Sequence, residues 1–363
     1  MQLQVTQENL NKALGTVGRV ANARGTLPVL ANVLIKTVEN RLSIAATNLD
    51  IGITHYIGAK VAEDGAITVP ARLMQDFISS LPGGVIDLKQ DDAKLAIATE
   101  QYQSVINGVA AEEFPVMPGI TEGQTWKIGG AQLKASLQQV ALAASTDEAR
   151  PVLTGVFIHS VDGKLCMAAT DSYRLAEKVL MPTTESVSLL VPVSAMQDVL
   201  RIVNDFDDEV IVMSDEQQVL FRAGDVELVA RLIEGKYPDY RKLLPAKFAV
   251  TATLKRADLL NVTKVSSLFA RESAGSITIH VDEASQELSI RSVASQLGEN
   301  TATAAAKIEG SGDITLNSRY LLDALHALSG PDVSFCFNGK LEPIVLVDPA
   351  ATDYTHLIMP LKS

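Results

Sequence analysis

Alternating apolar and polar residues, which predict β-hairpins, occur three times along the chain at a regular spacing. Hairpins are expected at residues 32–47, 155–170 and 276–293. Strict alternation is typical of strands with one buried face, and Asp162-Gly163 favours a tight turn in the second hairpin. The same place in each hairpin is held by Leu42, Leu165 and Leu288, which follow one another at intervals of 123 residues. This constant period predicts three copies of one structural unit.

Apolar residues at helical spacing accompany the hairpins in each copy. Leu10, Leu14 and Val17 fall on one face of a predicted helix, and Leu133, Leu137 and Val140 repeat that spacing 123 residues later. Helices are expected at 9–24, 71–81, 131–145, 193–204, 255–268 and 318–328. Each unit therefore reads helix, strands, helix, strands, like a doubled half-unit.

The predicted boundaries fall in segments with proline and glycine, around 115–123 and 237–245. They give three domains, at residues 1–120, 124–245 and 246–363.

Composition adds a broad class to this organisation. The chain has 363 residues, of which 47% are hydrophobic, and no apolar run approaches the roughly 18 residues of a membrane span. Its first residues alternate like a strand and do not resemble a secretory signal. We therefore expect a soluble, cytoplasmic protein that does not bind a membrane. Cys166 and Cys336 lie far apart in apolar strands, and we expect two buried thiols in a reducing compartment.

Charge is distributed unevenly along the chain, whose net charge is −12. The six predicted helices contain ten Lys and Arg residues against four Asp residues, so they carry +6 and the rest of the chain carries −18. If the helices line one surface, that surface would attract phosphates while the acidic remainder repelled DNA. The same excess is also typical of ordinary solvated helix faces.

Motifs for catalysis or for cofactor binding are missing from the sequence. No phosphate-binding glycine loop, His-Glu-x-x-His motif or Gly-x-Ser-x-Gly turn occurs, and the five histidines are scattered. The acidic run 205–209 is a weak metal candidate and is more typical of a solvated turn. We expect no enzyme activity, cofactor or metal, although a catalytic group assembled only in three dimensions stays open.

Five short segments carry a resemblance that covers the whole chain, namely residues 24–30, 150–156, 169–176, 237–240 and 358–361. With them the chain resembles the bacterial DNA polymerase III beta subunit, the sliding clamp. The resemblance implies an α+β DNA clamp fold of three repeated domains, each with two helices and antiparallel sheets. It also implies a head-to-tail homodimer that closes a six-domain ring around double-stranded DNA and tethers the replicative DNA polymerase without catalysing a reaction.

The resemblance implies loose contacts to phosphates, which carry no sequence information and so permit sliding. Arg24 matches a DNA-contact position of the family, and Arg150 lies in another of the resembling segments. Helix placement adds the remaining candidates, Arg72, Lys134, Arg201, Lys255 and Lys264. For the subunit boundary of the dimer, the expected contact lies at the end of the fifth helix, at Ser267 and Leu268.

A second implied function is the capture of short peptide motifs between the second and third domains. The implied partners are the polymerase, the clamp loader, repair and translesion polymerases, and ligase or mismatch-repair proteins. The matching positions are Leu153, Thr170, Ser172, Tyr173, Arg174, Leu175, Pro238, Lys242, Leu243, Ile344, Met359, Pro360 and Leu361. Ser172 and Tyr173 depart from the Gly-His usual in the family, and the larger Tyr173 would alter peptide preference.

Two other functions are compatible with the sequence. An enzyme on a repeated α+β scaffold would require a cluster of titratable or metal-binding groups in a pocket. A peptide-binding scaffold that never touches DNA would lack a basic inner surface and a closed ring. The clamp hypothesis instead predicts that circular DNA retains the protein and that a DNA end releases it.

Overall fold

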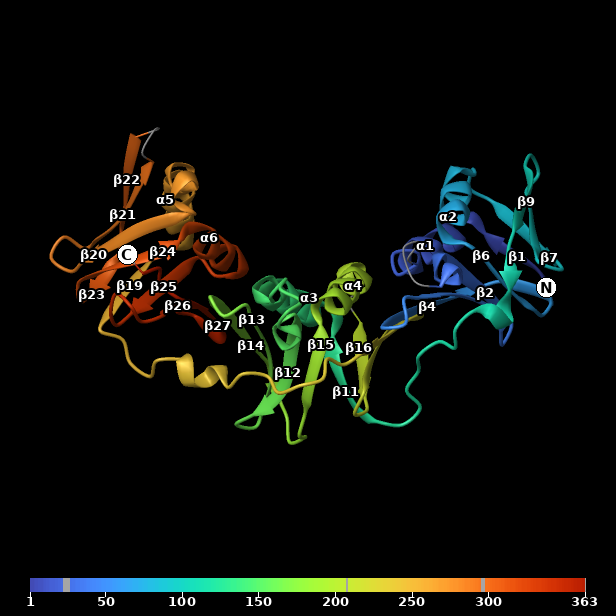
Figure 1. Ribbon diagram of the computed structural model, residues 1–363, viewed down its shortest axis with the longest axis horizontal. Coiled ribbons are helices and arrows are strands. Elements are labelled where there is room, and N and C mark those ends of the chain that lie inside the picture. The colour runs from blue at the N-terminus through green and yellow to red at the C-terminus, as the bar shows by residue number, and fades with distance from the viewer. Residues whose placement is uncertain (22–26, 207, 295–297, 363) are drawn as a thin grey trace. The chain divides into compact units, whose positions relative to one another are not determined.

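The computed structural model describes residues 1–21, 27–206, 208–294 and 298–362 (Figure 1). The chain forms two compact units, which are described separately. Unit 1 comprises Met1–Lys134 and Gln197–Leu232, and unit 2 comprises Ala135–Met196 and Ile233–Ser363. Two helices, α3 (Gly130–Val140) and α4 (Val193–Ile202), run from one unit into the other.

Unit 1 contains two antiparallel sheets. The smaller has the order β5-β1-β7-β8-β9 and is built from β1 (Gln2–Thr6), β5 (Lys60–Glu63), β7 (Val85–Asp91), β8 (Lys94–Ala98) and β9 (Gln103–Asn107). The larger has the order β10-β6-β2-β3-β4-β18-β17-β16-β11. Its strands are β2 (Asn32–Val38), β3 (Arg41–Thr47), β4 (Ile51–Gly58), β6 (Ala66–Pro70), β10 (Val109–Ala110), β11 (Gln124–Gly129), β16 (Glu209–Ser214), β17 (Gln218–Ala223) and β18 (Val226–Arg231).

Unit 2 is built in the same way. Its larger sheet, β15-β12-β13-β14-β27-β26-β25-β19-β23, contains β12 (Gly155–Val161), β13 (Lys164–Thr170), β14 (Arg174–Pro182), β15 (Ser188–Pro192), β19 (Val250–Lys255), β23 (Lys307–Glu309), β25 (Asp332–Phe337), β26 (Ile344–Asp348) and β27 (Ala351–Ile358). The smaller sheet, β22-β21-β20-β24, contains β20 (Ser276–Asp282), β21 (Glu287–Ala294), β22 (Gly298–Ala305) and β24 (Gly312–Asn317).

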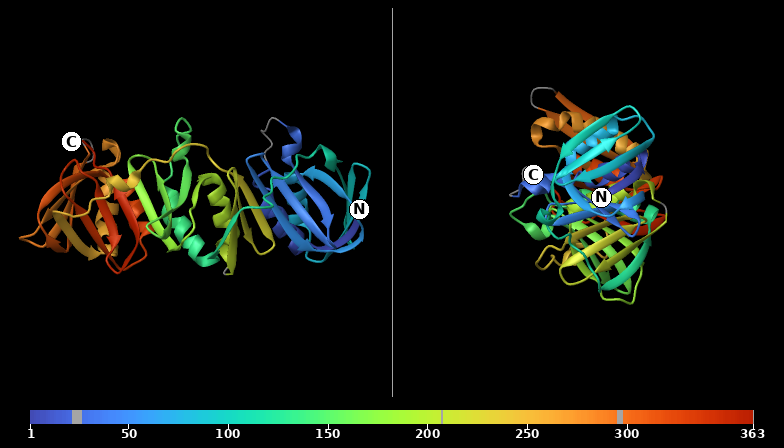
Figure 2. Two further views of the ribbon diagram at one scale, coloured as in Figure 1. Left: turned by 90° about the horizontal axis from the view of Figure 1, so that it is seen from below. Right: turned by 90° about the vertical axis from the view of Figure 1, so that its right-hand side faces the viewer.

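Helices cover the sheets in both units (Figures 1 and 2). In unit 1, α1 (Gln7–Val17) packs on β3 and β4 and against α2 (Ala71–Ser80). In unit 2, α5 (Arg256–Phe269) packs on β21 and β22 and against α6 (Ser318–Ala327). The buried residues of α1 are Leu10, Ala13, Leu14 and Val17, as a 3.6-residue period requires.

The sheets repeat a four-stranded half-sheet. In the described residues the six half-sheets are β1-β7-β8-β9, β6-β2-β3-β4, β11-β16-β17-β18, β15-β12-β13-β14, β19-β25-β26-β27 and β24-β20-β21-β22. Half-sheets join edge to edge where β4 pairs with β18 and where β14 pairs with β27. In the same position of the repeat, β22 and β9 are outer strands of their sheets, without a neighbour among the described strands.

The two joints differ at one register position. In unit 1, His55 of β4 lies opposite Val226 of β18. In unit 2, the corresponding residue of β14, Lys178, lies opposite Tyr354 of β27. The correspondence follows from the neighbouring strands. Ile44 of β3 pairs with His55, and Met167 of β13 pairs with Lys178. Because Met167 follows Ile44 by 123 residues, which is the repeat interval, Lys178 corresponds to His55. A small side chain in unit 1 thus stands where unit 2 has a large one.

The two joints also differ where a connecting segment crosses them. At Gly52 of β4, an added Cβ atom would lie 2.8 Å from the Pro118 side chain and 3.0 Å from that of Met117. The segment after Phe114 therefore covers Gly52 directly. The residue of β14 that corresponds to Gly52 is Leu175, whose side chain belongs to an apolar cluster of unit 2.

The predicted fold class is confirmed as a three-domain fold with two helices and antiparallel sheets in each repeat. The hairpins are confirmed as well, and Glu39 and Asn40 both have positive φ, as their tight turn requires. The first helix was predicted too long, because it ends at Val17 and the Gly18 N–H closes its last turn on the Leu14 carbonyl. The predicted domain boundaries stay predictions.

The burial of the two cysteines and the length of the described helices can be compared with what the sequence predicted. Cys166 and Cys336 are both buried free thiols, and burial raises the pKa of Cys166 to about 11. Among the described helices, none is long and apolar enough to cross a membrane.

Candidate functional site

An apolar cluster at the surface of unit 2 is the strongest candidate site for a partner. Its buried members are Ala168, Leu175, Leu190, Tyr237, Tyr240, Val345 and Leu357, and its half-buried members are Val152, Phe157, Ile233, Leu244, Val347 and Met359. Beside it in the chain, Tyr173 and Leu243 are 59% and 50% exposed. Large apolar side chains that stay exposed beside a packed cluster are typical of a protein-binding surface.

The turn between β13 and β14 is held rigidly beside this cluster. The Asp171 carboxylate accepts hydrogen bonds from the backbone amides of Tyr173 and Arg174, both at 2.9 Å. The Thr170 hydroxyl donates to the Arg174 carbonyl at 2.6 Å and accepts from the Ser172 amide at 3.1 Å. These bonds hold Ser172 at a φ of 79°, which costs free energy for a residue with a Cβ atom. Tyr173 is thus presented on a fixed backbone.

Arg174 connects this turn to helix α6. Its guanidinium donates to Asp171 at 3.0 Å and to Asp323 at 2.6 Å, and it lies 4.7 Å from the centre of the Tyr320 ring. The side chain is 13% exposed, so these ion pairs are poorly screened by solvent. Arg174 therefore braces the turn, and the direct contact with a peptide that we expected of it stays a prediction.

A buried polar network fastens the segment that enters the cluster from residue 233. The Tyr240 hydroxyl donates to the Glu177 carboxylate and lies 2.7 Å from His159 Nε2. Arg241 completes the network with Nε 3.3 Å from Glu177 and Nη1 2.6 Å from Asp162. Burial, and then the nearby Glu177 carboxylate, raises the pKa of Tyr240, so its proton stays in place to donate.

Aromatic stacking continues the same segment into the sheet. The Phe157 ring stacks on those of His159 and Tyr237, with centroids 4.5 and 4.7 Å apart. Tyr237 meets Tyr240 edge on, with centroids 6.3 Å apart. What the sequence indicated as a connecting segment is thus anchored by two tyrosines in the core of unit 2.

The end of the chain lies on the same side of unit 2. The Met359 amide donates to the Tyr173 carbonyl at 2.8 Å, and the Leu361 amide donates to the Thr315 carbonyl at 2.8 Å. Met359, Pro360 and Leu361 are half-buried. These residues therefore form a fixed border of the cluster, although they belong to no helix or strand.

The structure assigns the thirteen predicted peptide-binding positions to three kinds of place, all within unit 2. Ser172, Tyr173, Pro238, Lys242 and Leu243 are exposed, whereas Arg174, Met359, Pro360 and Leu361 are half-buried. Buried positions are Leu153, Thr170, Leu175 and Ile344. Of these four only Leu175 belongs to the apolar cluster, and side chains as buried as these offer little surface to a ligand.

Sequence reasoning missed part of this site. Phe157, Tyr237 and Tyr240 were not among the predicted positions, although two tyrosines in a proline-containing connector were a signal that it is anchored. Val152 and Val347 were also missed, because alternation alone cannot tell a core residue from one at the edge of a surface cluster.

The predicted DNA-contact residues occupy varied settings. Arg24 lies outside the described residues. The Arg72 side chain is 97% exposed, and Lys264 is exposed on α5. Lys134 donates to the Asn204 carbonyl at 2.8 Å. Four of the described candidates are in ion pairs with carboxylates, namely Arg72–Asp76 at 3.9 Å, Arg150–Asp147 at 2.9 Å, Arg201–Asp198 at 2.6 Å and Lys255–Asp332 at 2.9 Å.

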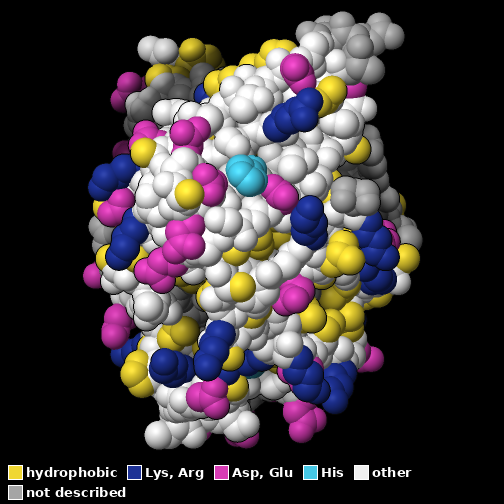
Figure 3. Space-filling model, turned by 90° about the vertical axis from the view of Figure 1, so that its left-hand side faces the viewer, with side chains coloured by type: hydrophobic (Ala, Val, Ile, Leu, Met, Phe, Trp, Pro, Cys, Tyr) yellow, Lys and Arg dark blue, Asp and Glu magenta, His cyan; other side chains and the backbone are white. Residues whose placement is uncertain are grey.

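Two of these residues lie outside the described α-helices, and for Lys255 this differs from the predicted helix 255–268. Arg150 precedes a short 3₁₀ helix and donates to the Ser172 hydroxyl at 2.9 Å, so it borders the apolar cluster. Lys255 is the last residue of β19 and stands just before α5. In Figure 3, basic and acidic side chains are interspersed over the face that it shows. The roles of these residues in DNA binding stay predictions.

The predicted dimer contact lies at the end of α5. Leu268 is 48% exposed and Val265, one turn earlier, is 47% exposed, while Ser267 is half-buried and donates to the Lys264 carbonyl. This pair of exposed apolar side chains on one helix face is compatible with a subunit contact, which stays a prediction.

Comparison with known proteins covers the chain from end to end. Models of the N-terminal, central and C-terminal domains of the DNA polymerase III beta subunit match residues 1–118, 127–239 and 241–362. The beta sliding clamps of Synechococcus elongatus and of a Synechocystis species are each 32% identical to the chain, over all of it and 99% of their own length.

Solved structures agree with these matches. The sliding clamp of Bacillus subtilis has a TM-score of 0.96 at 26% identity, over 100% of this chain and 99% of that one. A sliding clamp of Pseudomonas aeruginosa bound to griselimycin has a TM-score of 0.95 at 25% identity, with both chains covered fully. The chain belongs to the DNA polymerase III beta subunit family, the beta sliding clamps.

Proposed function

We propose that this chain is a DNA-encircling processivity factor, a head-to-tail homodimer that holds a replicative polymerase on duplex DNA. The observation that carries the proposal is the pattern of half-sheet joints. β4 pairs with β18, β14 pairs with β27, and the equivalent strands β22 and β9 have free edges. Pairing β22 of one copy with β9 of the next repeats the same joint, and two such joints would close a ring in which β22 and β9 no longer have a free edge.

Charge supports duplex DNA as the cargo of the ring. Arg72 and Lys264 are exposed helix cations, and Arg201 and Lys134 lie on α4 and α3. Contacts from such side chains to phosphates are independent of base sequence and weaken as salt concentration rises. A ring can bind weakly through them and still stay on DNA, because leaving requires a DNA end or an open joint.

Topology gives the experiment that tests encirclement. The protein is loaded on a nicked circular plasmid by a clamp loader, the loader is removed with salt, and the DNA is then linearised. We expect retention on the circle and loss after cutting. Equal retention on circular and linear DNA would show ordinary binding and refute the ring.

The joint itself is tested by paired substitutions in the smaller sheet of unit 1. Val105 on the edge strand β9 and Val85 on the inner strand β7 are 62% and 56% exposed. Val105→Asp places a charge at the proposed joint and should convert dimers into monomers, as measured by light scattering. Val85→Asp carries the same change away from the edge and should remain dimeric. Equal behaviour of the two variants would argue against pairing through β9.

A second contact is tested in the same assay. Leu268→Lys on α5 should weaken the dimer, whereas Leu341→Lys, which replaces a 69% exposed leucine in the turn after β25, should not. A Leu268→Lys variant with unchanged dimer affinity would remove Leu268 from the interface.

We infer that the apolar cluster of unit 2 binds short peptide motifs of the polymerase, the clamp loader and repair proteins. Its support is the combination of exposed Tyr173 and Leu243 with a fixed floor and a fixed border at Met359. An apolar surface with few polar groups at its edge suits a peptide that inserts apolar side chains. Such a protein acts by holding partners together and needs no catalytic group.

Truncation tests this peptide site. Removing residues 359–363 deletes the border, and we expect at least a tenfold loss of affinity for a peptide that contains Gln and Leu or Phe, measured by fluorescence anisotropy. Removing residues 362 and 363 alone is the matched control and should leave affinity unchanged. Both proteins should remain dimers. Unchanged peptide affinity in the longer truncation would refute the assignment.

A further inference from the structure

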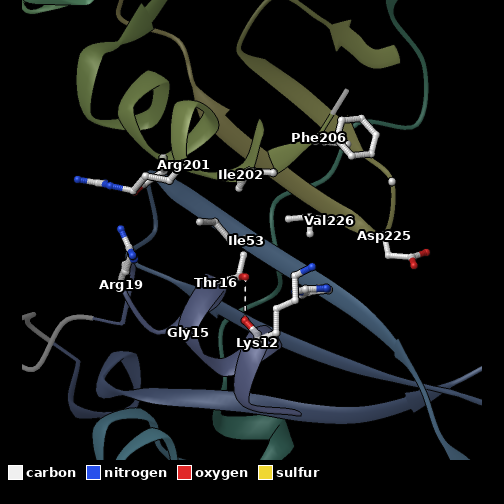
Figure 4. A pocket seen from close by; sticks show the side chains of 14 residues that line it. Lys12, Gly15, Thr16, Arg19, Ile53, Arg201, Ile202, Phe206, Asp225 and Val226 are labelled. Atoms are coloured by element: carbon white, nitrogen blue, oxygen red, sulfur yellow. Dashed lines mark hydrogen bonds and ion pairs between the residues drawn. The ribbon is translucent and has the colours of Figure 1, made fainter. Parts of the chain in front are cut away.

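A pocket in unit 1 is separate from the peptide-binding cluster. It lies between helices α1 and α4 and beside strands β4 and β18, and its volume is about 470 Å³. Its lining includes Lys12, Arg19, Arg201, His55 and Phe206 (Figure 4). Cavities of this size are common for small-molecule ligands. We call it the α1–α4 pocket.

The pocket exists because one side chain of the repeat is small. In unit 2, Tyr354 is 2% exposed, and its hydroxyl donates to the Gln139 carbonyl at 3.0 Å. Tyr354 thus fills the joint up to helix α3. In unit 1 the equivalent residue is Val226, and Thr16, which is equivalent to Gln139, lines open space. A valine at this position fills less of the joint than a tyrosine would.

Charge in the pocket favours an anion. Lys12, Arg19 and Arg201 line it together with Asp198 and Asp225. Both carboxylates already have partners, since Asp198 lies 2.6 Å from Arg201 and Asp225 lies 2.8 Å from Arg41. Lys12 and Arg19 form no ion pair with a described residue, so their charges stay uncompensated at the pocket.

A buried ring nitrogen without a hydrogen-bond partner is a second feature of the pocket. His55 is 7% exposed, lines the pocket, and has no hydrogen-bond partner for Nδ1 among the described residues. Such an atom is costly unless a ligand or water reaches it. Burial and then Lys12 lower the pKa of His55 to about 4, so the free imidazole is neutral at pH 7. An anion bound beside it would raise that pKa, because it stabilises the imidazolium.

The two ends of the pocket differ in character. Figure 4 shows Arg19 and Arg201 at one end and Phe206 with Asp225 at the other. Ile53, Ile202 and Val226 form apolar walls between them. The guanidinium of Arg19, unpaired among the described residues, and the remaining donors of Arg201, whose Nη1 is bonded to Asp198, can bind phosphate oxygens. An aromatic ring with apolar walls suits a ring-shaped body.

We propose that the α1–α4 pocket binds an organic phosphate of mononucleotide size, with its phosphate at Arg19 and Arg201 and its body toward Phe206. The site goes beyond the proposed clamp function and does not depend on ring closure. A free nucleotide and the 5′-phosphorylated end of a DNA single strand present the same chemistry, and the experiment separates them.

Calorimetric titration of the unloaded protein tests the proposal with four probes. They are inorganic phosphate, adenosine, adenosine monophosphate and a 5′-phosphorylated tetranucleotide. We expect adenosine monophosphate to bind more tightly than phosphate or adenosine alone. Tighter binding of the tetranucleotide would identify a strand end as the source, and its failure beside bound adenosine monophosphate would identify a free nucleotide. Equal binding of adenosine and adenosine monophosphate, or no binding at millimolar concentration, would refute the site.

Variants connect binding to the pocket. Arg19→Ala should weaken the binding of adenosine monophosphate about tenfold, as expected for loss of one charge-assisted hydrogen bond. Lys60→Ala removes an exposed cation of β5, outside the pocket lining, and should have no effect. Val226→Tyr should abolish binding by filling the space as Tyr354 does. Equal affinities of Arg19→Ala and Lys60→Ala would refute the assignment.

A spectroscopic measurement keeps the test independent of folding defects. The NMR titration of the His55 imidazole in the native protein should move to higher pH when adenosine monophosphate is bound. A His55 titration that is unchanged by saturating ligand would place the ligand elsewhere. Because retention on circular DNA uses no ligand of this pocket, failure here leaves the proposed clamp function untouched.

Discussion

The buried network around Tyr240 gives a prediction with an internal control. Tyr240→Phe keeps the ring but removes the hydroxyl that donates to Glu177 and contacts His159 Nε2. Glu177 and His159 are only 6% and 9% exposed, so water does not readily replace the lost partner. A hydrogen bond to a charged group contributes about 1.5–3 kcal/mol, and we expect a loss near the upper end of that range.

The matched control is Tyr237→Phe in the same cluster. Tyr237 is as buried as Tyr240, but its hydroxyl has no well-formed hydrogen bond to a described residue. Burial, the largest influence, raises the pKa of Tyr237, and the Thr170 backbone acts in the opposite direction. Removing this hydroxyl should change the free energy of unfolding by less than about 1 kcal/mol.

The assay must report on unit 2. The single tryptophan, Trp126, lies in β11 of unit 1, so its fluorescence does not follow the network. Hydrogen exchange of peptides from β13 and β14 reports on the network directly. A loss of about 2–3 kcal/mol in stability accelerates this exchange roughly 30- to 150-fold. If Tyr240→Phe exchanges within about twofold of Tyr237→Phe, the network does not stabilise unit 2 and the reasoning fails.

Two further predictions concern a buried histidine and a helix glycine. Burial lowers the pKa of His356 to about 3, below its ordinary value of 6.5, so the unfolded chain binds the extra proton first and stability falls as pH drops below 6.5. Between pH 7 and 5 this loss is about 2 kcal/mol, and His356→Gln should flatten the exchange-measured stability of unit 2 over that range; an unchanged slope would assign the effect to other groups. Gly15 lies inside α1, and a Cβ atom added there would be 3.9 Å from the Gln75 side chain, so an alanine fits. Gly15→Ala should stabilise unit 1 by about 0.5–1 kcal/mol, measured by urea unfolding followed by Trp126 fluorescence. A loss of stability would show that the helix needs glycine at this position.

Much of the fold could be predicted because its information is local and repeated. Alternation identified the hairpins, and the interval between Leu42, Leu165 and Leu288 identified the repeat. The end of α1 could not be predicted, because the apolar spacing continues through Ala21 although the backbone closes at Gly18. Strand pairing between repeats, such as β14 with β27, also lay beyond the sequence, since register depends on neighbours that are distant along the chain.

The candidate sites show the same limit. Tyr173, Leu243 and Met359 could be predicted because they match positions of a known family, whereas the exposed or buried state of each depends on packing. The α1–α4 pocket had no signal in the sequence. It results from Val226 facing His55 across two strands that are 171 positions apart, and a single valine in an alternating strand is an ordinary residue.

Gly52, covered by Met117 and Pro118, determines how many partners the proposed assembly could serve. At the joint of β4 with β18 the place equivalent to Leu175 is covered by the chain's own connector. If the proposed peptide site and dimer hold, this joint would offer no second peptide site, and the Leu175 clusters would give one site per chain and two per dimer. A polymerase and a repair enzyme could then bind one ring together, but a third protein could bind only after one of them had dissociated. The rate at which partners replace one another on the ring would then depend on how quickly each bound partner dissociates.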